Sequence, residues 1–284
     1  MVVKLVAVFL VAALAAGGIV LARGSGRERA AAGTVVWAVG DGADGSPAGR
    51  RLARYVRRRR PARFLYLGDV YERGTAAEFA QHYDPGYGAL ARRTDPVLGN
   101  HEFPQRAVGY LPYWRRARGW SRARALHRAY VDASGWQVIA YSSESDPARE
   151  AAWVHRQVAR HAGTCRIAFA HRGRYVLADS AHDDNPDQAP VWRELAGRTA
   201  INLVGHNHIY ARLAPIDGVT VLLSGAGGHD LRQPGKRRHA VASVEAGVPT
   251  ATRLVLRKAA ADFRQVDAEG RVYDSGAIRC TPAG

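Results

Sequence analysis

Short apolar runs alternate with longer amphipathic segments along the first two thirds of this chain. Runs of four to six residues predict buried strands, and the segments between them predict helices. Pro47 stands near the first turn of one helix, and Asp146 caps another with Pro147 at its first position. The expected strands are 34–39, 64–67, 95–98, 136–141, 167–170 and 201–204, and the expected helices are 47–60, 75–82, 147–161 and 191–195.

The last third of the chain has a different pattern, because the expected strands follow one another with few helices between them. The expected strands there are 219–223, 252–256, 262–266 and 272–273. Residues 104–128 are rich in Arg and aromatic side chains without a clean period, so we expect a loop-rich insertion. Helices that alternate with strands first, followed mainly by strands, indicate an α/β fold.

Residues that can bind metal ions follow several of the apolar runs. Asp, Asn or His comes at or just after the ends of five runs: Asp41, Asp69, Asn100, His171, and the pair His206 and His208. Such ends meet at the carboxyl edge of a sheet, so these side chains are expected to converge. Carboxylates, an amide and imidazoles without a thiolate suit Fe, Mn, Zn or Mg, and argue against a structural zinc site of the cysteine type.

Composition changes this picture little. The 284 residues are nearly half apolar and carry a formal charge of +16, which invites a nucleic-acid interpretation. However, only three of the 41 basic residues are Lys, and the Arg residues are spread widely. We therefore expect no specific nucleic acid as a partner, and we assign Trp114 and Trp120 to a lid or to packing.

The N-terminus carries an uncharged apolar run at residues 5–22, preceded by Lys4. Such a run is a signal peptide or a membrane anchor, so residues 1–30 are expected to be a targeting segment with a linker and 31–284 one catalytic domain. Export follows in both cases, and attachment to a membrane through 5–22 stays open. The two cysteines, Cys165 and Cys280, then form either a disulfide or two buried thiols.

The order of the short motifs resembles one family. Gly40-Asp41, Gly68-Asp69, Gly99-Asn100-His101-Glu102, His171 and Gly205-His206-Asn207-His208 follow one another as in the calcineurin-like metallophosphoesterases. Within that family the chain looks most like the bacterial, purple-acid-phosphatase-like branch, over about residues 34–280.

The resemblance implies a two-sheet β-sandwich flanked by helices, with two divalent or mixed-valence metal ions (Fe, Mn or Zn). Asp41 and His208 would hold the first metal; Asn100, His171 and His206 would hold the second; Asp69 would bridge them. His101 would stabilise the transition state or protonate the leaving oxygen. The implied activity is hydrolysis of a small phosphate mono- or diester through attack by a hydroxide that bridges the metals.

Two positions depart from the family pattern. Tyr71 lies two residues after Asp69, whereas relatives place a metal-binding Tyr three residues after that Asp, so Tyr71 either reaches the metals or points away. Arg172 follows His171 where relatives often carry Pro, and it either contacts the substrate phosphate or lies at the surface. Two alternative functions stay open: a nuclease or nucleotide hydrolase of the same family, and a non-catalytic envelope protein that binds a phosphorylated ligand.

Overall fold

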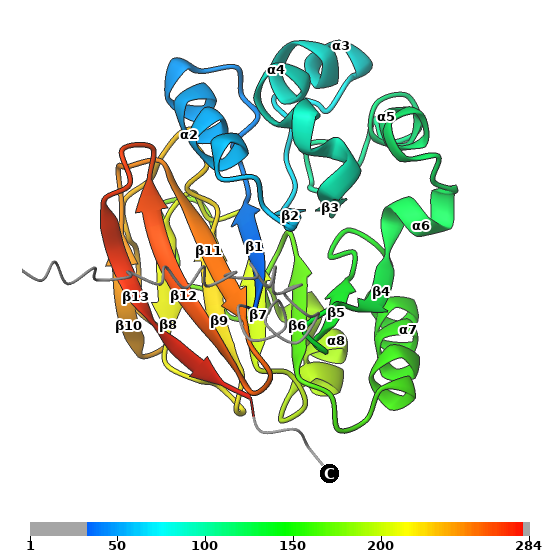
Figure 1. The fold of residues 1–284 in the computed structure, drawn as a ribbon, viewed down its shortest axis with the longest axis vertical. Helices are drawn as coiled ribbons and strands as arrows, with labels where there is room; N and C mark the ends of the chain where they lie inside the picture. The colour runs from blue at the N-terminus through cyan, green and yellow to red at the C-terminus, as the bar shows by residue number, and fades with distance from the viewer. Residues whose placement is uncertain (1–32, 281–284) are drawn as a thin grey trace, which may run out of the picture.

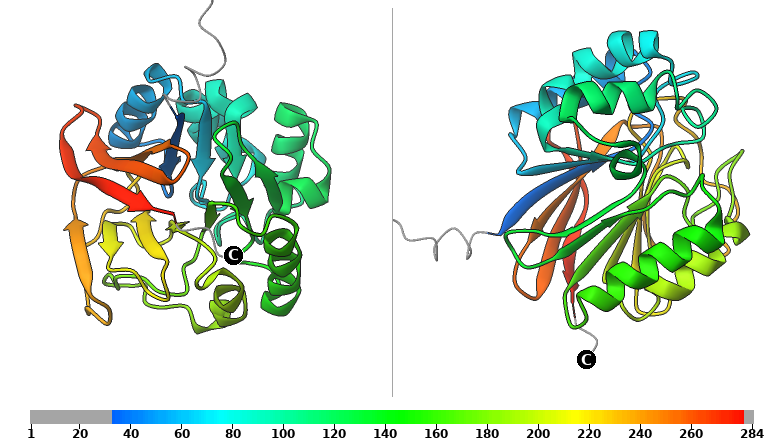
Figure 2. Two further views of the ribbon diagram at one scale, coloured as in Figure 1. Left: turned by 60° about the horizontal axis from the view of Figure 1, so that its bottom comes forward. Right: turned by 90° about the vertical axis from the view of Figure 1, so that its right-hand side faces the viewer.

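The computed structural model describes residues 33–280 and has four layers. Two β-sheets pack face to face, and helices cover the outer face of each (Figures 1 and 2). The expected two-sheet sandwich flanked by helices is thus confirmed. None of the helices within residues 33–280 is long and apolar enough to cross a membrane. The apolar run at 5–22 lies outside the described residues.

The first sheet has a parallel half and an antiparallel half. β1 is parallel to β2, β2 is parallel to β3, and β1 is antiparallel to β11. In spatial order its strands are β13 (Val272–Arg279), β12 (Ala260–Asp267), β11 (Thr250–Leu256), β1 (Thr34–Val39), β2 (Arg63–Tyr66) and β3 (Thr94–Pro96).

The second sheet has a parallel centre, in which β5, β6, β7 and β9 run the same way. In spatial order its strands are β10 (Val241–Glu245), β8 (Tyr210–Leu213), β9 (Thr220–Ser224), β7 (Ile201–Val204), β6 (Arg166–Ala170), β5 (Gln137–Ala140) and β4 (Arg128–Val131). The parallel strands of both sheets carry the candidate site at their carboxyl ends.

Alternation along β1 explains how the layers hold together. Val36 and Ala38 pack between the sheets, whereas Trp37 and Val39 pack on the helices of the outer layer. All four side chains are almost fully buried. A strand that is apolar on both faces belongs in the middle of such a sandwich.

The helices start where capping side chains allow. Ser46 and Asp146 accept hydrogen bonds from the first turns of α2 and α7, and Thr75 forms a capping box with Glu78. The first sheet's outer layer contains α2 (Pro47–Arg58), α3 (Ala76–Glu78), η1 (Phe79–Tyr83), α4 (Asp84–Tyr87), η2 (Gly88–Arg93), α5 (Tyr110–Arg118) and α6 (Arg122–Leu126). The second sheet's outer layer contains α7 (Pro147–Arg160), η3 (Pro186–Gln188) and α8 (Ala189–Leu195).

The prediction of a loop-rich segment at 104–128 was wrong, because this segment contains α5 and α6. Tyr110, Tyr113 and Trp114 stand three and one residues apart and bury one face of α5. Trp120 packs on Trp114, with ring centroids 6.0 Å apart. Both Trp side chains therefore belong to the core beside the first sheet. Strands β4, β8 and β10 were not predicted.

The two cysteines form a disulfide, which settles the alternative that the sequence left open. Cys165 lies just before β6 and Cys280 just after β13, with their Cα atoms 5.6 Å apart. The bond therefore joins the second sheet to the first at the ends remote from the candidate site.

Candidate metal centre

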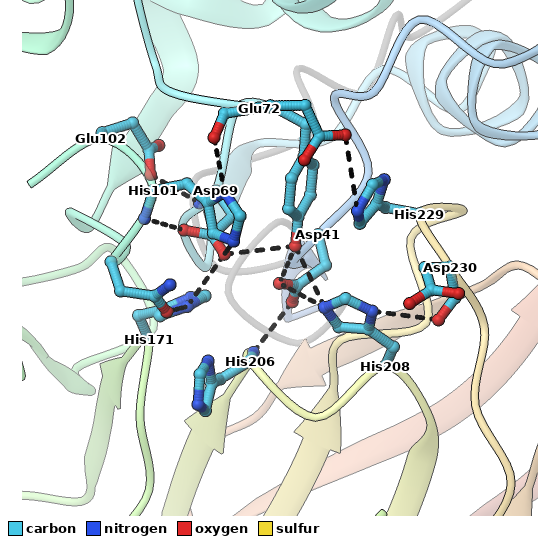
Figure 3. A network of polar contacts seen from close by, with 12 residues as sticks. Asp41, Asp69, Glu72, His101, Glu102, His171, His206, His208, His229 and Asp230 are labelled. Atoms are coloured by element: carbon cyan, nitrogen blue, oxygen red, sulfur yellow. Dashed lines mark hydrogen bonds and ion pairs between the residues drawn. The ribbon is translucent and has the colours of Figure 1, made fainter. Parts of the chain in front are cut away.

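The predicted ligands come together where the two sheets meet. Asp41 and Asp69 follow β1 and β2 of the first sheet, while His171 follows β6 and His206 follows β7 of the second. In Figure 3 these residues and His208 surround one space. Asp41 and Asp69 are 0% and 1% exposed, so neither carboxylate is solvated.

The backbone at these positions is unusual. Asp41, Asp69 and His206 have φ angles of 57°, 65° and 68°, in the left-handed region that non-glycine residues seldom adopt. Glycines precede all three, and a Cβ on Gly40 would stand 3.0 Å from the Cα of Gly205. The two sheets thus approach each other closely at the site, and strain of this kind is concentrated at functional positions.

Tyr71 points into the site. Its hydroxyl donates to Asp41 Oδ1 at 2.8 Å and lies 3.1 Å from both Asp69 Oδ2 and His208 Nε2. His208 Nε2 itself lies 3.6 Å from Asp41 Oδ1. The shorter spacing after Asp69 therefore does not keep the phenol away from the donors proposed for the first metal.

The donors proposed for the second metal gather around His171. Its Nε2 lies 3.3 Å from Asp69 Oδ2 and 3.0 Å from Asn100 Oδ1. Ligand atoms of Asp69, His171 and His206 all lie within 4.8 Å of one another, close enough to share one ion. The backbone N–H of His206 donates to Asp41 Oδ2 at 2.9 Å, which couples the two halves of the site.

Backbone carbonyls orient two of the imidazoles. His171 Nδ1 lies 2.8 Å from the carbonyl oxygen of Leu67, and His208 Nδ1 lies 3.0 Å from that of Asp230. Since a carbonyl only accepts, each Nδ1 carries a proton. Although burial acts against it, Asp69 raises the pKa of His171 to about 10, so this imidazole is charged. Burial lowers the pKa of His208, so its Nε2 keeps a lone pair toward the site. Metal-binding histidines are commonly held in this way.

Burial and charge shift the ionisation of the site. Burial raises the pKa of Asp41, against the opposing effect of His171 and His208. Burial also acts on Asp69, but the neighbouring His171 and His101 hold the pKa of this carboxyl well below its usual range. Burial, and then the charge of His171, lowers the pKa of His206, so that its imidazole is neutral. Two buried carboxylates that depend on the charge of His171, beside a neutral His206, form a site that a metal cation would stabilise.

His101 stands at the open side of the centre. Its backbone N–H donates to Asp69 Oδ1 at 3.1 Å, and its Nδ1 lies 2.6 Å from the carbonyl oxygen of Glu72. Its Nε2 lies 3.9 Å from Asp69 Oδ2, and its side chain is 32% exposed. A cavity of about 380 Å³ lies beside it, lined by Glu72, Arg73, Asn100, His101, Pro104 and Gln105. His101 is thus placed to touch a molecule that enters from this cavity.

Arg172 is held beside the centre. Its Nε lies 3.1 Å from Glu144 Oε1, and its backbone N–H donates to Ser143 Oγ. Its charge contributes to the low pKa of His206. The contact of Arg172 with a substrate phosphate stays a prediction.

The sequence interpretation missed two histidines at the site. The ring centroid of His182 lies 4.1 Å from that of His206, and Asp179 accepts from His182 Nδ1 and from the backbone N–H of His208. His229 stacks on Tyr71 at 3.5 Å. Both histidines lie on irregular segments outside the predicted strands and helices, so no apolar run pointed to either of them.

Known proteins support the same classification. Residues 34–225 match the family model of the calcineurin-like phosphoesterases. The search of curated proteins gives no match. Among solved structures, the chain is similar to the yellow lupin (Lupinus luteus) purple acid phosphatase PPD1, with 14% identity, a TM-score of 0.68, and coverage of 87% of this chain and 54% of that one.

Two further solved structures share the fold. GAP50, the anchor in the inner membrane complex of Plasmodium, has 12% identity and a TM-score of 0.69, with 88% of this chain and 90% of that one covered. A dimetal phosphatase from Danio rerio has 11% identity and a TM-score of 0.60, with 87% and 98% covered. The fold, the ordered motifs and the family match together show that this chain belongs to the calcineurin-like phosphoesterase family.

Proposed function

We propose that this protein is an exported phosphoesterase that uses two metal ions to hydrolyse small phosphate mono- or diesters. The observation that carries the proposal is the position of Asp69, whose carboxylate faces both sets of donors. Its Oδ2 lies 3.1 Å from the Tyr71 hydroxyl on one side and 3.3 Å from His171 Nε2 on the other.

The donors fit such a pair of ions. Asp41, His208 and the phenol of Tyr71 would hold the first ion, with Asn100, His171 and His206 for the second and Asp69 shared. Oxygen and imidazole donors suit Fe, Mn or Zn. Burial raises the pKa of Asp41 because it disfavours the charged carboxylate, and a cation beside the carboxylate would offset this cost. When bound, two such ions supply Lewis acidity toward phosphate oxygens and lower the pKa of water.

The chain's own residues provide the rest of the mechanism. The Glu72 carbonyl fixes His101 Nδ1, so Nε2 faces the open side of the centre and, in the imidazolium form, donates a proton to the leaving oxygen. Asn100 and Arg73 line the same cavity and orient the ester group. The volume of about 380 Å³ suits a small phosphorylated substrate.

Export is supported by the disulfide, because such bonds persist in oxidising compartments. The apolar run at 5–22 is consistent with a signal peptide or an anchor, and a membrane contact through it is part of the proposal.

Metal analysis of the purified protein, followed by mono- and diester assays on the same sample, tests the proposal. About two ions per chain with turnover of either ester support it. Metal-free protein without turnover contradicts it and favours a non-catalytic role. GAP50 shares this fold and is described as an anchor, so the fold alone does not separate the two functions.

A further inference from the structure

The edge strands β3 and β4 lie near α6 and α7 (Figure 1). Residues of these elements line a second and larger cavity. It has a volume of about 730 Å³. Its charged lining is strongly unbalanced, since Asp95 is the sole carboxylate among the residues that line it. The guanidinium groups belong to Arg63, Arg118, Arg124, Arg128 and Arg160. We call this the arginine cavity.

Two of these arginines are fixed by the fold. Arg128 is buried and lies 3.3 Å from Asp95 Oδ1, and it also donates to the carbonyl of Pro96. Arg118 donates to the carbonyls of Ala91 and Thr94. Their guanidinium carbons stand 4.2 and 4.3 Å from the centre of the Trp120 ring. The floor of the cavity is therefore rigid and positively charged.

The other three arginines have unused donors. Within residues 33–280 the guanidinium groups of Arg63, Arg124 and Arg160 make no hydrogen bond or ion pair. Aromatic rings position two of them: the guanidinium carbon of Arg63 stands 5.0 Å from the Tyr130 ring centre, and that of Arg124 stands 5.8 Å from the Trp120 ring centre. Their donors remain available to a ligand.

This crowding has an electrostatic consequence. The pKa of Arg118 is lowered by burial and by the charges of Arg128, Arg63 and Arg124, although Asp95 opposes the shift. Arginines that are merely solvated at a surface do not crowd in this way, so the wide scatter of Arg over the chain does not account for the cavity. An anion among these groups would relieve their repulsion.

The arginine cavity is separate from the metal centre. Arg63 is the first residue of β2, whereas Asp69 follows the opposite end of that strand. We propose that the arginine cavity binds a small polyanion that carries several phosphate groups. Guanidinium groups pair with phosphate oxygens in a bidentate geometry, and the volume is that of a small-molecule site.

Fluorescence anisotropy of pyrenetetrasulfonate, a planar dye with four fixed charges, tests this proposal on the metal-loaded protein. We expect saturable binding that tripolyphosphate displaces. The double variant Arg63→Ala/Arg124→Ala should weaken dye affinity at least about tenfold and leave phosphoesterase activity unchanged. The matched control, Arg51→Ala/Arg58→Ala, removes the same charge from exposed positions of α2 and should leave dye affinity unchanged.

Three results would overturn the inference. Equal weakening in the control variant would show general charge attraction. Release of the dye in His206→Ala would place it at the metal centre. Displacement by a single-stranded oligonucleotide at far lower concentration than tripolyphosphate would assign the cavity to nucleic acid. Because dye binding is measured apart from turnover, its failure leaves the proposed phosphoesterase function untouched.

Discussion

The two sides of the candidate metal centre, one around Tyr71 and the other around His206, differ in the polar contacts that their proposed metal donors make. On the Tyr71 side, the phenol touches Asp41, Asp69 and His208 within 3.1 Å. On the His206 side, the close contacts are those of His171 with Asp69 and Asn100. On the first side a neutral phenol donates to a carboxylate, whereas on the second side a charged imidazole, that of His171, pairs with Asp69.

This difference indicates that the two ions would be held unequally. Burial, and then Asp41 and Asp69, raise the pKa of Tyr71 well above its usual value, so the phenol keeps its proton. An ion on that side must either displace this proton or bind beside the phenol. On the other side His206 is neutral because burial and His171 lower its pKa, and a neutral imidazole binds metal directly.

The largest effect is expected from removing the carboxylate of Asp69, which both sides of the candidate centre share. Asp69→Asn is expected to lower turnover at least about a thousandfold, because both sides lose the group that joins them. Ester assays measure this, and circular dichroism checks the fold. Asp44→Asn, which changes the carboxylate 3.8 Å from His229 Nδ1, should lower turnover less than tenfold. An equal loss in Asp44→Asn would mean that the ligands are assigned wrongly.

We also expect that either metal ion can be removed without the other. His206→Ala and His208→Ala should each reduce the bound metal from about two ions to about one, since each imidazole serves one ion. Metal analysis after gel filtration gives the count. Loss of both ions in either variant would contradict two separable sides.

Tyr71→Phe tests the asymmetry itself. Deleting the phenol oxygen, a proposed donor to the first ion, should weaken the affinity of that ion by about ten- to a hundredfold and leave the other unchanged. A competition titration with a chelating dye resolves the two constants. Shifts of similar size in both constants, or in neither, would show that the phenol does not distinguish the sides.

The smallest effect is expected far from the centre. Arg212 and Tyr210 on β8 bind Asp274 on β13 and, against burial, lower its pKa. A carboxyl whose pKa is lower in the folded state stabilises the fold at pH values above its pKa in the unfolded chain, about 3.9 for Asp. This stabilisation is lost as the pH falls through the pKa of the folded state. Asp274→Asn should therefore cost about 1 kcal/mol of unfolding free energy at pH 7 after screening by solvent, and this cost should disappear as the pH falls through the pKa of Asp274 in the folded protein.

Denaturant titrations of both proteins across pH measure this difference, and neither side of the metal centre should change. A variant that lost metal as well would indicate that inter-sheet contacts control the centre.

Much of this architecture could be predicted because strands buried on both faces have strong apolar patterns. Ile201–Val204 was predicted with the bounds that the structure has. The edge strand β10 (Val241–Glu245) could not be, since its side chains are half-exposed and mixed in polarity. In α5 the spacing of Tyr110, Tyr113 and Trp114 was a helical signal that the surrounding arginines obscured.

The candidate ligands could be chosen because each follows a strand that enters the same edge. His182 and His229 could not, because they lie on irregular segments whose paths depend on long-range contacts. The Asp179 carboxylate accepts two hydrogen bonds from His182 and one from the backbone N–H of Ala181, and no periodic pattern predicts such a turn.

The disulfide has a consequence for the centre, although it lies at the opposite ends of the sheets. The carboxylates proposed as ligands follow strands of one sheet and the proposed imidazoles follow strands of the other, so the candidate centre exists only while the sheets stay together. Cys165 and Cys280 are 115 residues apart, and a cross-link over such a span removes about 4 to 5 kcal/mol of chain entropy from the unfolded state. The disulfide therefore holds the two sheets together, and with them the two halves of the candidate site, independently of metal binding.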